Sequence, residues 1–180
     1  MKLYTVDRAK TLKTGMRLEL FTDRKYNVDS PVEVGVNKLI ESWFPDGVAE
    51  HGNTYIFRLP NMLPEKMVME YPAFICESVF ELIRQLQFPD RLSRFQSVFA
   101  TDEENLDEMI ARIAQGTDYN VFELNCDKYE KYDMNWVKGN TFAVCSYAAT
   151  RYWSGAVSDN PLFEYLVHPP VVVSEQIIPK

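Results

Sequence analysis

Short segments rich in β-branched and aromatic residues recur along the whole chain, whereas amphipathic helical segments are concentrated in its first two thirds. A doubly wound parallel sheet would instead need strands and helices that alternate regularly. The sequence therefore predicts an α+β fold. Because the 180 residues contain no Gly/Ser-rich linker and no internal repeat, we expect one domain that spans residues 1–180.

Local patterns predict where the elements lie. Apolar alternation and β-propensity predict strands at residues 3–6, 17–21, 53–58, 95–99, 121–124, 134–137, 141–145, 164–167 and 171–173. Residues 60–64 are expected to form a loop. Capping patterns, proline positions and helical spacing predict helices at residues 31–43, 72–88 and 101–116 and a short one at 147–152. We expect Leu106, Met109, Ile110 and Ile113 to be buried on one helical face.

Charge and hydropathy exclude several classes of protein. The whole net charge of −7 lies after residue 100, and the first 25 residues are rich in Lys and Arg. A protein that coats DNA by charge is therefore implausible, although a local basic patch that holds phosphates stays open. Apolar runs are too short for a membrane-spanning helix, and the N-terminus lacks an apolar signal core, so we expect a cytoplasmic protein without a membrane partner.

The cysteines and histidines do not indicate a metal site. Cys76, Cys126 and Cys145 are widely spaced with no CxxC pair, and the two histidines are His51 and His168. Four neighbouring metal ligands are hard to assemble from this set, so no metal is expected and the cysteines are read as free thiols. A catalytic cysteine paired with a histidine remains an alternative.

The familiar catalytic motifs are absent. The sequence contains no GxGxxG, phosphate-binding P-loop, HExxH, GxSxG or kinase signature. These absences disfavour a Rossmann dehydrogenase and a nucleotide triphosphatase.

Weaker candidates remain. Arg8 follows the first predicted strand, where it could grip a phosphate or simply cap the strand. Ser93, Arg94 and Ser97 precede or enter another strand and suit a pyrophosphate or ribose, but also a tight turn. Tyr152 and Trp153 could stack on a planar ring or pack in the core.

Glu164 is the most suggestive carboxylate. It stands at the start of the apolar run at residues 165–167. A carboxylate there could accept a hydrogen bond from a sugar hydroxyl or stabilise a developing positive charge. It could equally protect an edge strand from pairing, and the spacing alone leaves both interpretations open.

Taken in order, these segments resemble the ADP-ribosyltransferase superfamily, and most closely its uncharacterised bacterial and phage domains. In that superfamily a first strand ends in Arg or His, a later strand contributes Ser, Thr or Tyr, and a late strand contributes Glu. The matching segments are residues 3–8 with Leu12 and Gly15, His51-Gly52, residues 80–84, 88–100, 133–136, 152–155 and 164–166.

The resemblance implies a split β-sandwich of two small sheets with flanking helices and NAD, as a substrate, in the cleft between the sheets. Arg8 would contact a phosphate or ribose of NAD and act with Glu164 in catalysis. Ser93, Arg94 and Ser97 would shape the nicotinamide-ribose side, where His51 and Trp153 are also expected to bind NAD. Glu164 would bind the nicotinamide ribose and orient the acceptor.

The sequence departs from the protein-modifying branch of that superfamily. It has no Ser-Thr-Ser triplet, and Leu162 stands two residues before Glu164, where Glu or Gln commonly orients protein acceptors. The expected activity is therefore transfer of ADP-ribose from NAD to a macromolecule, with nucleic acid somewhat favoured over protein. The chain would act as a toxin or phage-conflict effector and have an antitoxin or inhibitor protein as partner.

An alternative is a non-catalytic binding or immunity-type module on the same scaffold, in which Glu164 is structural. The two hypotheses differ in one observable feature. A transferase requires Arg8 and Glu164 to converge on one cleft.

Overall fold

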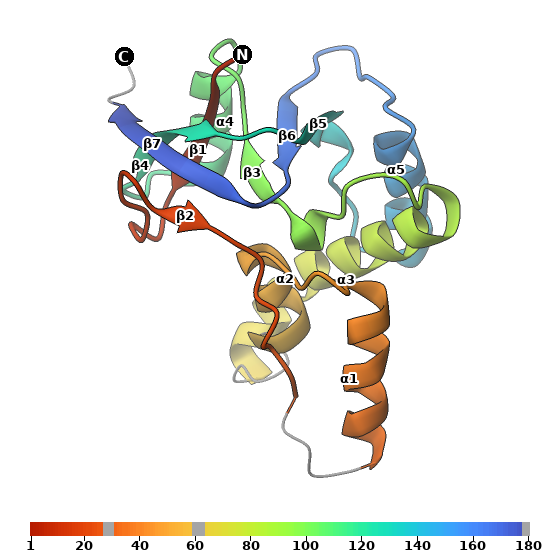
Figure 1. The fold of residues 1–180 in the computed structure, drawn as a ribbon. Coiled ribbons are helices and arrows are strands. Elements are labelled where there is room, and N and C mark those ends of the chain that lie inside the picture. The colour runs from red at the N-terminus through yellow and green to blue at the C-terminus, as the bar shows by residue number, and fades with distance from the viewer. Residues whose placement is uncertain (27–30, 59–63, 178–180) are drawn as a thin grey trace.

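The computed structural model describes the backbone of residues 1–26, 31–58 and 64–177, and the side chains of these residues except 64–71. Within this part of the chain the structure is mixed helix and antiparallel sheet, which confirms the predicted α+β class. In Figure 1 the strands gather in the upper half of the molecule, and helices α1, α2 and α3 lie below them.

Two sheets are built entirely from antiparallel pairs. The first has the order β1-β4-β7-β2 and consists of Leu3–Asp7 (β1), Asn120–Asn125 (β4), Val171–Ile177 (β7) and Arg17–Leu18 (β2). The second has the order β3-β6-β5 and consists of Val98–Ala100 (β3), Phe163–Val167 (β6) and Tyr129–Asp133 (β5). Tyr4 and Thr101 exchange two backbone hydrogen bonds of 2.8 Å, which tie β1 to the end of β3.

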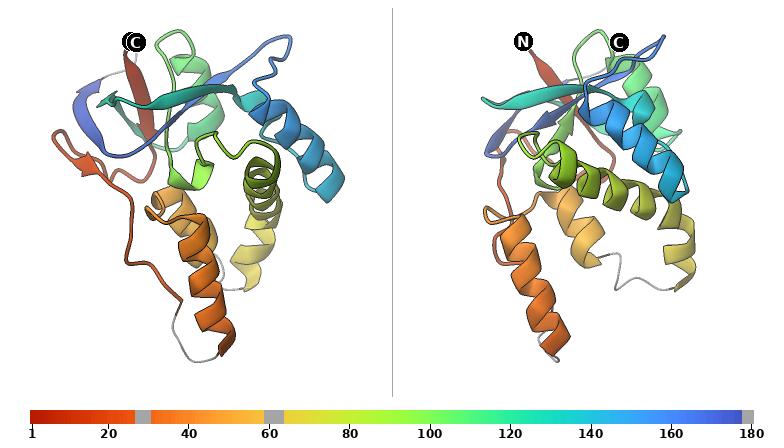
Figure 2. Two further views of the ribbon diagram at one scale, coloured as in Figure 1. Left: turned by 45° about the vertical axis from the view of Figure 1, so that its right-hand side comes forward. Right: turned by 90° about the vertical axis from the view of Figure 1, so that its right-hand side faces the viewer.

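The helices flank these sheets. They are Pro31–Trp43 (α1), Glu50–Asn53 (α2), Pro64–Gln87 (α3), Leu106–Ala114 (α4) and Phe142–Trp153 (α5), with a π-helical segment at Thr54–Arg58 (η1) and 3-10 turns at Arg94–Gln96 (η3) and Met134–Trp136 (η4). The two further views in Figure 2 keep α1, α2 and α3 on one side of the strands.

Strand β6 separates two regions of the apolar core. Successive side chains of a strand point to opposite faces. Tyr165 and Val167 pack with side chains of β1, β4 and β7, including Leu3, in the core between the sheets. Leu166 packs with side chains of α3 and α5 on the other face. Glu164 has the same parity as Leu166 and therefore lies on the helix side of this strand.

Most of the predicted strands near the chain ends are confirmed. The strands at 3–6, 121–124, 164–167 and 171–173 all form, whereas the strand expected at 17–21 shortens to Arg17–Leu18. The helix at 31–43 forms with the predicted bounds. The cap expected at residue 30 and most of the loop expected at 60–64 lie outside the described residues.

Three predicted strands are wrong because tertiary packing overrides local β-propensity. Residues 53–58 are helical, since Phe57 packs with Phe44 and Phe95 in a small apolar cluster beside α1. Residues 134–136 form the turn η4, and residues 142–145 begin α5, which extends the short helix predicted at 147–152. The segment predicted as a strand at 95–99 is divided between η3 and β3.

The two later helix boundaries also differ from prediction. Helix α3 begins at Pro64, so Pro72 lies inside it and does not open it. Helix α4 begins at Leu106 and does not use Thr101 as a cap, because Asp102 Oδ1 instead accepts a 3.0 Å hydrogen bond from the Asn105 amide. On the predicted apolar face, Leu106 and Met109 are buried, whereas Ile110 and Ile113 are only partly buried.

Candidate functional site

A cavity of about 680 Å³ opens between the end of β1, the segment that contains β2, helix α2 and residues 94–101. This volume lies within the usual range for pockets that bind small molecules and cofactors. Its walls combine apolar side chains with a few charged ones. Five of the residues predicted from the sequence line it, namely Arg8, His51, Arg94, Ser97 and Glu164.

A second, mostly apolar cavity of about 370 Å³ lies between α1 and α3. None of the residues predicted for the site lines it. The larger cavity is therefore the candidate site.

Arg8 lies at the edge of the cavity, one residue after β1. It is solvent-exposed, and its Nη1 donates a 3.2 Å hydrogen bond to the backbone carbonyl of Ile113. Since no other hydrogen bond of this side chain is found among the described residues, most of the guanidinium's donors are free there to bind an anion.

Arg94 lies at the inner wall and is only 4% exposed. Its Nε and Nη2 donate to the two carboxylate oxygens of Glu77 on α3 at 2.9 and 2.8 Å. Its Nη1 donates to Glu164 Oε1 at 2.5 Å and to the Tyr152 hydroxyl oxygen at 3.0 Å. All three guanidinium nitrogens of Arg94 thus donate to protein groups, and the bond from Nη1 fixes Oε1 of Glu164.

Glu164 is 3% exposed and lies near the start of β6. Besides Arg94, the Tyr152 hydroxyl donates a 2.8 Å hydrogen bond to its Oε1. Both protein partners therefore end on one carboxylate oxygen. Among the described residues no hydrogen bond reaches Oε2, which leaves that oxygen for a ligand in the cavity that Glu164 lines.

The electrostatics of this cluster follow from burial and from Arg94. Burial alone would raise the pKa of Glu77, but the neighbouring Arg94 and His51 outweigh it and hold that pKa far below its ordinary value. Burial and the adjacent Glu164 carboxylate raise the pKa of the Tyr152 hydroxyl, so this phenol stays a hydrogen-bond donor. Arg94 is thus the cation that the carboxylates of Glu77 and Glu164 share, with Nη2 to Glu77 at 2.8 Å and Nη1 to Glu164 at 2.5 Å.

His51 reaches the cavity from α2, which is docked tightly on η3. The Ala49 amide donates a 2.8 Å hydrogen bond to the Phe95 carbonyl. A Cβ atom at Gly52 would lie 2.3 Å from that same carbonyl oxygen, so only glycine permits this approach. The close contact places His51 beside the segment that carries Arg94.

The imidazole of His51 packs against three aromatic rings. Its centroid lies 4.7 Å from those of Tyr55 and Phe99 and 6.0 Å from that of Phe95. Its Nε2 lies 3.2 Å from Glu77 Oε2, although this buried nitrogen has no well-aligned hydrogen bond within the described structure.

The two predicted serines serve the local turn. Ser97 lines the cavity, but its hydroxyl donates a 2.7 Å hydrogen bond to the Ser93 carbonyl. Ser93 lies outside the cavity lining, where its hydroxyl donates to Glu81 at 2.8 Å and accepts from the Phe95 amide at 3.0 Å. The turn interpretation of this pair therefore accounts for both hydroxyls.

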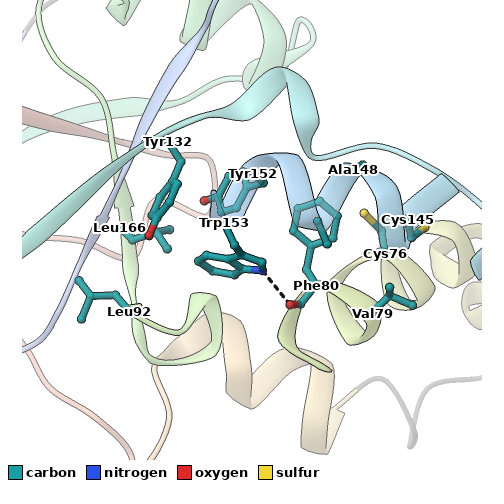
Figure 3. Close-up of a cluster of buried hydrophobic side chains, with 11 residues drawn as sticks. Cys76, Val79, Phe80, Leu92, Tyr132, Cys145, Ala148, Tyr152, Trp153 and Leu166 are labelled. Carbon is teal, nitrogen blue, oxygen red and sulfur yellow. Dashed lines mark hydrogen bonds between the residues drawn. The ribbon is translucent and has the colours of Figure 1, made fainter. Parts of the chain in front are cut away.

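Trp153 does not reach the cavity. Figure 3 shows it in the apolar cluster between α3 and α5, where its indole donates a 2.8 Å hydrogen bond to the Phe80 carbonyl. Tyr152, one residue earlier, directs its hydroxyl to Arg94 and Glu164 instead. Consecutive residues of a helix point about 100° apart, which separates this aromatic pair between core and site.

Sequence reasoning missed Glu77, and it considered Tyr152 only as a ring that stacks or packs. Glu77 resembles an ordinary surface glutamate of a helix, although it is 6% exposed. The signal available was spacing, because Glu77, Glu81 and Arg84 recur at intervals of four and three on one side of α3, beside the apolar Cys76 and Phe80.

Cys76 and Cys145 are buried and lie outside the lining of the larger cavity. Burial raises the pKa of Cys76 to about 12, which disfavours the reactive thiolate. Cys145 is fully buried, and Figure 3 shows both thiols together where α3 packs on α5. Within the described residues no group of three or more His, Cys, Asp or Glu side chains is arranged to hold a metal ion.

Comparison with known proteins identifies the family. The sequence pattern of a family described as "Protein of unknown function (DUF2441)" matches residues 7–179. The chain belongs to this family. The matched DUF2441 region includes all five predicted residues that line the cavity. A search of curated proteins found no match. Across the described residues, none of the helices combines the length and apolar character needed to cross a membrane.

Proposed function

We propose that this DUF2441 chain is an NAD-dependent ADP-ribosyltransferase whose larger cavity binds NAD. The observation that carries the proposal is the convergence of Arg8 and Glu164. These residues are 156 positions apart in sequence, come from different sheets and line one cavity. Two small antiparallel sheets with flanking helices are the arrangement expected of the split β-sandwich of ADP-ribosyltransferases.

The groups that line the cavity suit the parts of NAD. Arg8 at the rim offers free donors of the kind that bind phosphate oxygens. Phe21, Phe99 and the apolar end of β1 offer surfaces for planar rings. Glu164 presents an oxygen that can accept a hydrogen bond from a ribose hydroxyl.

The position of the Glu164 carboxylate at the cavity wall suits the reaction. When the bond between nicotinamide and ribose breaks, its electron pair leaves with nicotinamide and positive charge develops on the sugar. A carboxylate already fixed beside that sugar stabilises the charge without reorganising. Arg94 and Tyr152 supply the fixation by holding Glu164 Oε1 from two directions.

The acceptor in the proposed reaction is a macromolecule, with nucleic acid favoured over protein. Leu162, two residues before Glu164, is fully buried, so it offers no polar group to orient a protein side chain. In this proposal the chain acts in the cytoplasm as a toxin or phage-conflict effector and is held in check by an antitoxin or inhibitor protein. Its free cysteines suit that reducing compartment.

The first experiment is incubation of the purified chain with NAD labelled in the adenylate part and with separate pools of RNA, DNA and protein. The proposal predicts release of nicotinamide and label in one macromolecular pool, most strongly in nucleic acid. A chain that neither binds nor cleaves NAD would contradict it.

The second candidate function is a non-catalytic binding module. The observation that favours it is the near-complete burial of Glu164 and the pairing of its Oε1 with Arg94 and Tyr152. In that case NAD or a related nucleotide would bind without release of nicotinamide, and the same incubation would show it.

A further inference from the structure

His51 and Glu77 form a pair that the NAD-binding role expected for His51 does not explain. Nε2 of His51 lies 3.2 Å from Glu77 Oε2, in a pocket where this nitrogen is buried. Glu77 is in turn fixed by two hydrogen bonds from Arg94. A carboxylate that faces one nitrogen of an imidazole favours the tautomer with the proton on that nitrogen.

The other ring nitrogen, Nδ1, is then the basic one. Within the part of the chain that the structure describes, Nδ1 makes no hydrogen bond and is not among the buried atoms without a partner. Since His51 lines the cavity, this nitrogen is available to a group bound there. The rings of Tyr55 and Phe99 hold the imidazole plane and restrict its rotation.

We propose that His51 is the general base of the reaction, oriented by Glu77, and that the acceptor is a neutral nucleophile that must lose a proton, such as a hydroxyl or a nucleobase N–H. This inference rests on the proposed function. The oxygen or nitrogen of the acceptor bonds to ribose C1′ as the bond to nicotinamide breaks. Nδ1 takes the proton of the acceptor, and the imidazole releases it to solvent afterwards.

The arrangement divides the work between two carboxylates that share one arginine. Glu164 faces the sugar, where positive charge develops, and Glu77 faces the histidine, which becomes positive when it accepts the proton. An anionic acceptor would need no base. The His51–Glu77 pair therefore points to an acceptor that is neutral and carries a proton at physiological pH.

One test needs no acceptor, because water serves as the nucleophile in the hydrolysis of NAD. His51→Gln should reduce that hydrolysis by about 100-fold, the lower end of the usual contribution of a general base. NAD binding, measured by calorimetry, should change little. The matched control is His168→Gln, because His168 lies outside the cavity lining. This variant should hydrolyse NAD at the rate of the wild type.

Sodium azide distinguishes a general base from a residue that only binds NAD. Azide is an anionic nucleophile and needs no proton removal, so it should restore nicotinamide release by His51→Gln and yield ADP-ribosyl azide. It should not restore Glu164→Gln, whose defect lies in charge stabilisation. Wild-type rates in His51→Gln, or a defect that azide leaves unchanged, would overturn the role of His51.

A second measurement does not depend on catalysis or on the variants. The ¹⁵N chemical shifts of the free wild-type protein report the tautomer of each imidazole, and the chain has two histidines to assign. At about pH 8, above the ordinary imidazole pKa, we expect His51 to carry its proton on Nε2. A proton on Nδ1 would overturn the inference and leave the proposed transferase activity standing, whereas a wild type that neither binds nor cleaves NAD would overturn both.

Discussion

In the part of α3 whose side chains are described, Glu77 and Glu81 are buried one turn apart, and each contacts a buried arginine. Glu81 binds Arg84, which also donates to the carbonyls of Pro89 and Arg91 at 3.2 and 3.1 Å. Glu77 binds Arg94, which binds Glu164 as well. Both clusters pair glutamate with arginine, but Arg84 binds one carboxylate and Arg94 binds two.

The difference separates a structural cluster from a candidate catalytic one. The Arg84 cluster pairs one carboxylate with one arginine, anchors the chain after α3, and neither Arg84 nor Glu81 lines the larger cavity. In the Arg94 cluster two carboxylates share one arginine, and Arg94 and Glu164 line that cavity. Buried charges are costly and add little stability even when paired, so the Arg94 cluster is the candidate for a functional role.

The largest expected effect is on stability, from Arg94→Met. This change leaves two buried carboxylates without their cation, and loss of one partner of a buried pair typically costs about 3–5 kcal/mol. Arg84→Met leaves one carboxylate, that of Glu81, without its cation, but Glu81 still accepts a hydrogen bond from the Ser93 hydroxyl. Urea unfolding should therefore show the greater loss for Arg94→Met, and an equal loss would remove the distinction between the clusters.

The next largest effect is on NAD cleavage. Glu164→Gln keeps the shape and an oxygen for Arg94 and Tyr152 but removes the charge, so nicotinamide release should fall by about 100-fold, or about 3 kcal/mol. NAD affinity should change much less, because the charge acts mainly in the transition state. The matched change in the other cluster, Glu81→Gln, should leave the rate unchanged. Equal rates in the two variants would make Glu164 structural.

Acid should weaken the Arg94 cluster through Glu77. Its pKa in the folded protein is lowered from the ordinary 4.5, so the stabilisation is complete above that value and declines as the pH falls below it. As the pH falls from about 5 to about 2, the free energy of unfolding, measured with urea, should decrease more for the wild type than for Glu77→Gln. Parallel pH profiles for the two proteins would show that Glu77 is not a paired carboxylate in solution.

The smallest expected effect comes from Arg8→Ala. Arg8 is exposed and makes one backbone contact, so the free energy of unfolding should change by less than about 0.5 kcal/mol. Loss of a charge-assisted contact to phosphate should weaken NAD binding by about tenfold. Lys2→Ala, which removes an exposed cation paired with Glu123 on the same sheet, is the control and should bind NAD normally. Normal NAD binding by Arg8→Ala would show that Arg8 does not contact a phosphate of NAD.

The sequence predicted Arg8, Glu164 and their strands because strand ends and isolated carboxylates leave local signals. It did not predict Glu77, whose pairing with Arg94 depends on how α3 packs against η3. It named Tyr152 and Trp153 together as rings for stacking but assigned only Trp153 to the site, because only the orientation of α5 decides which of two adjacent aromatics faces the charges. Residues 53–58 have a strand-like composition, but their packing beside α1 makes them helical.

The central claim is that the cavity binds NAD with its nicotinamide ribose at Glu164. The most direct test is a crystal structure of the wild-type chain with carba-NAD, in which a carbocycle replaces the nicotinamide ribose and its bond to nicotinamide resists cleavage. We predict that the analogue lies between β1 and residues 94–101, with a hydroxyl of the carbocycle hydrogen-bonded to Glu164 and a phosphate beside Arg8. An analogue bound elsewhere, or an empty cavity at saturating concentration, would contradict the claim.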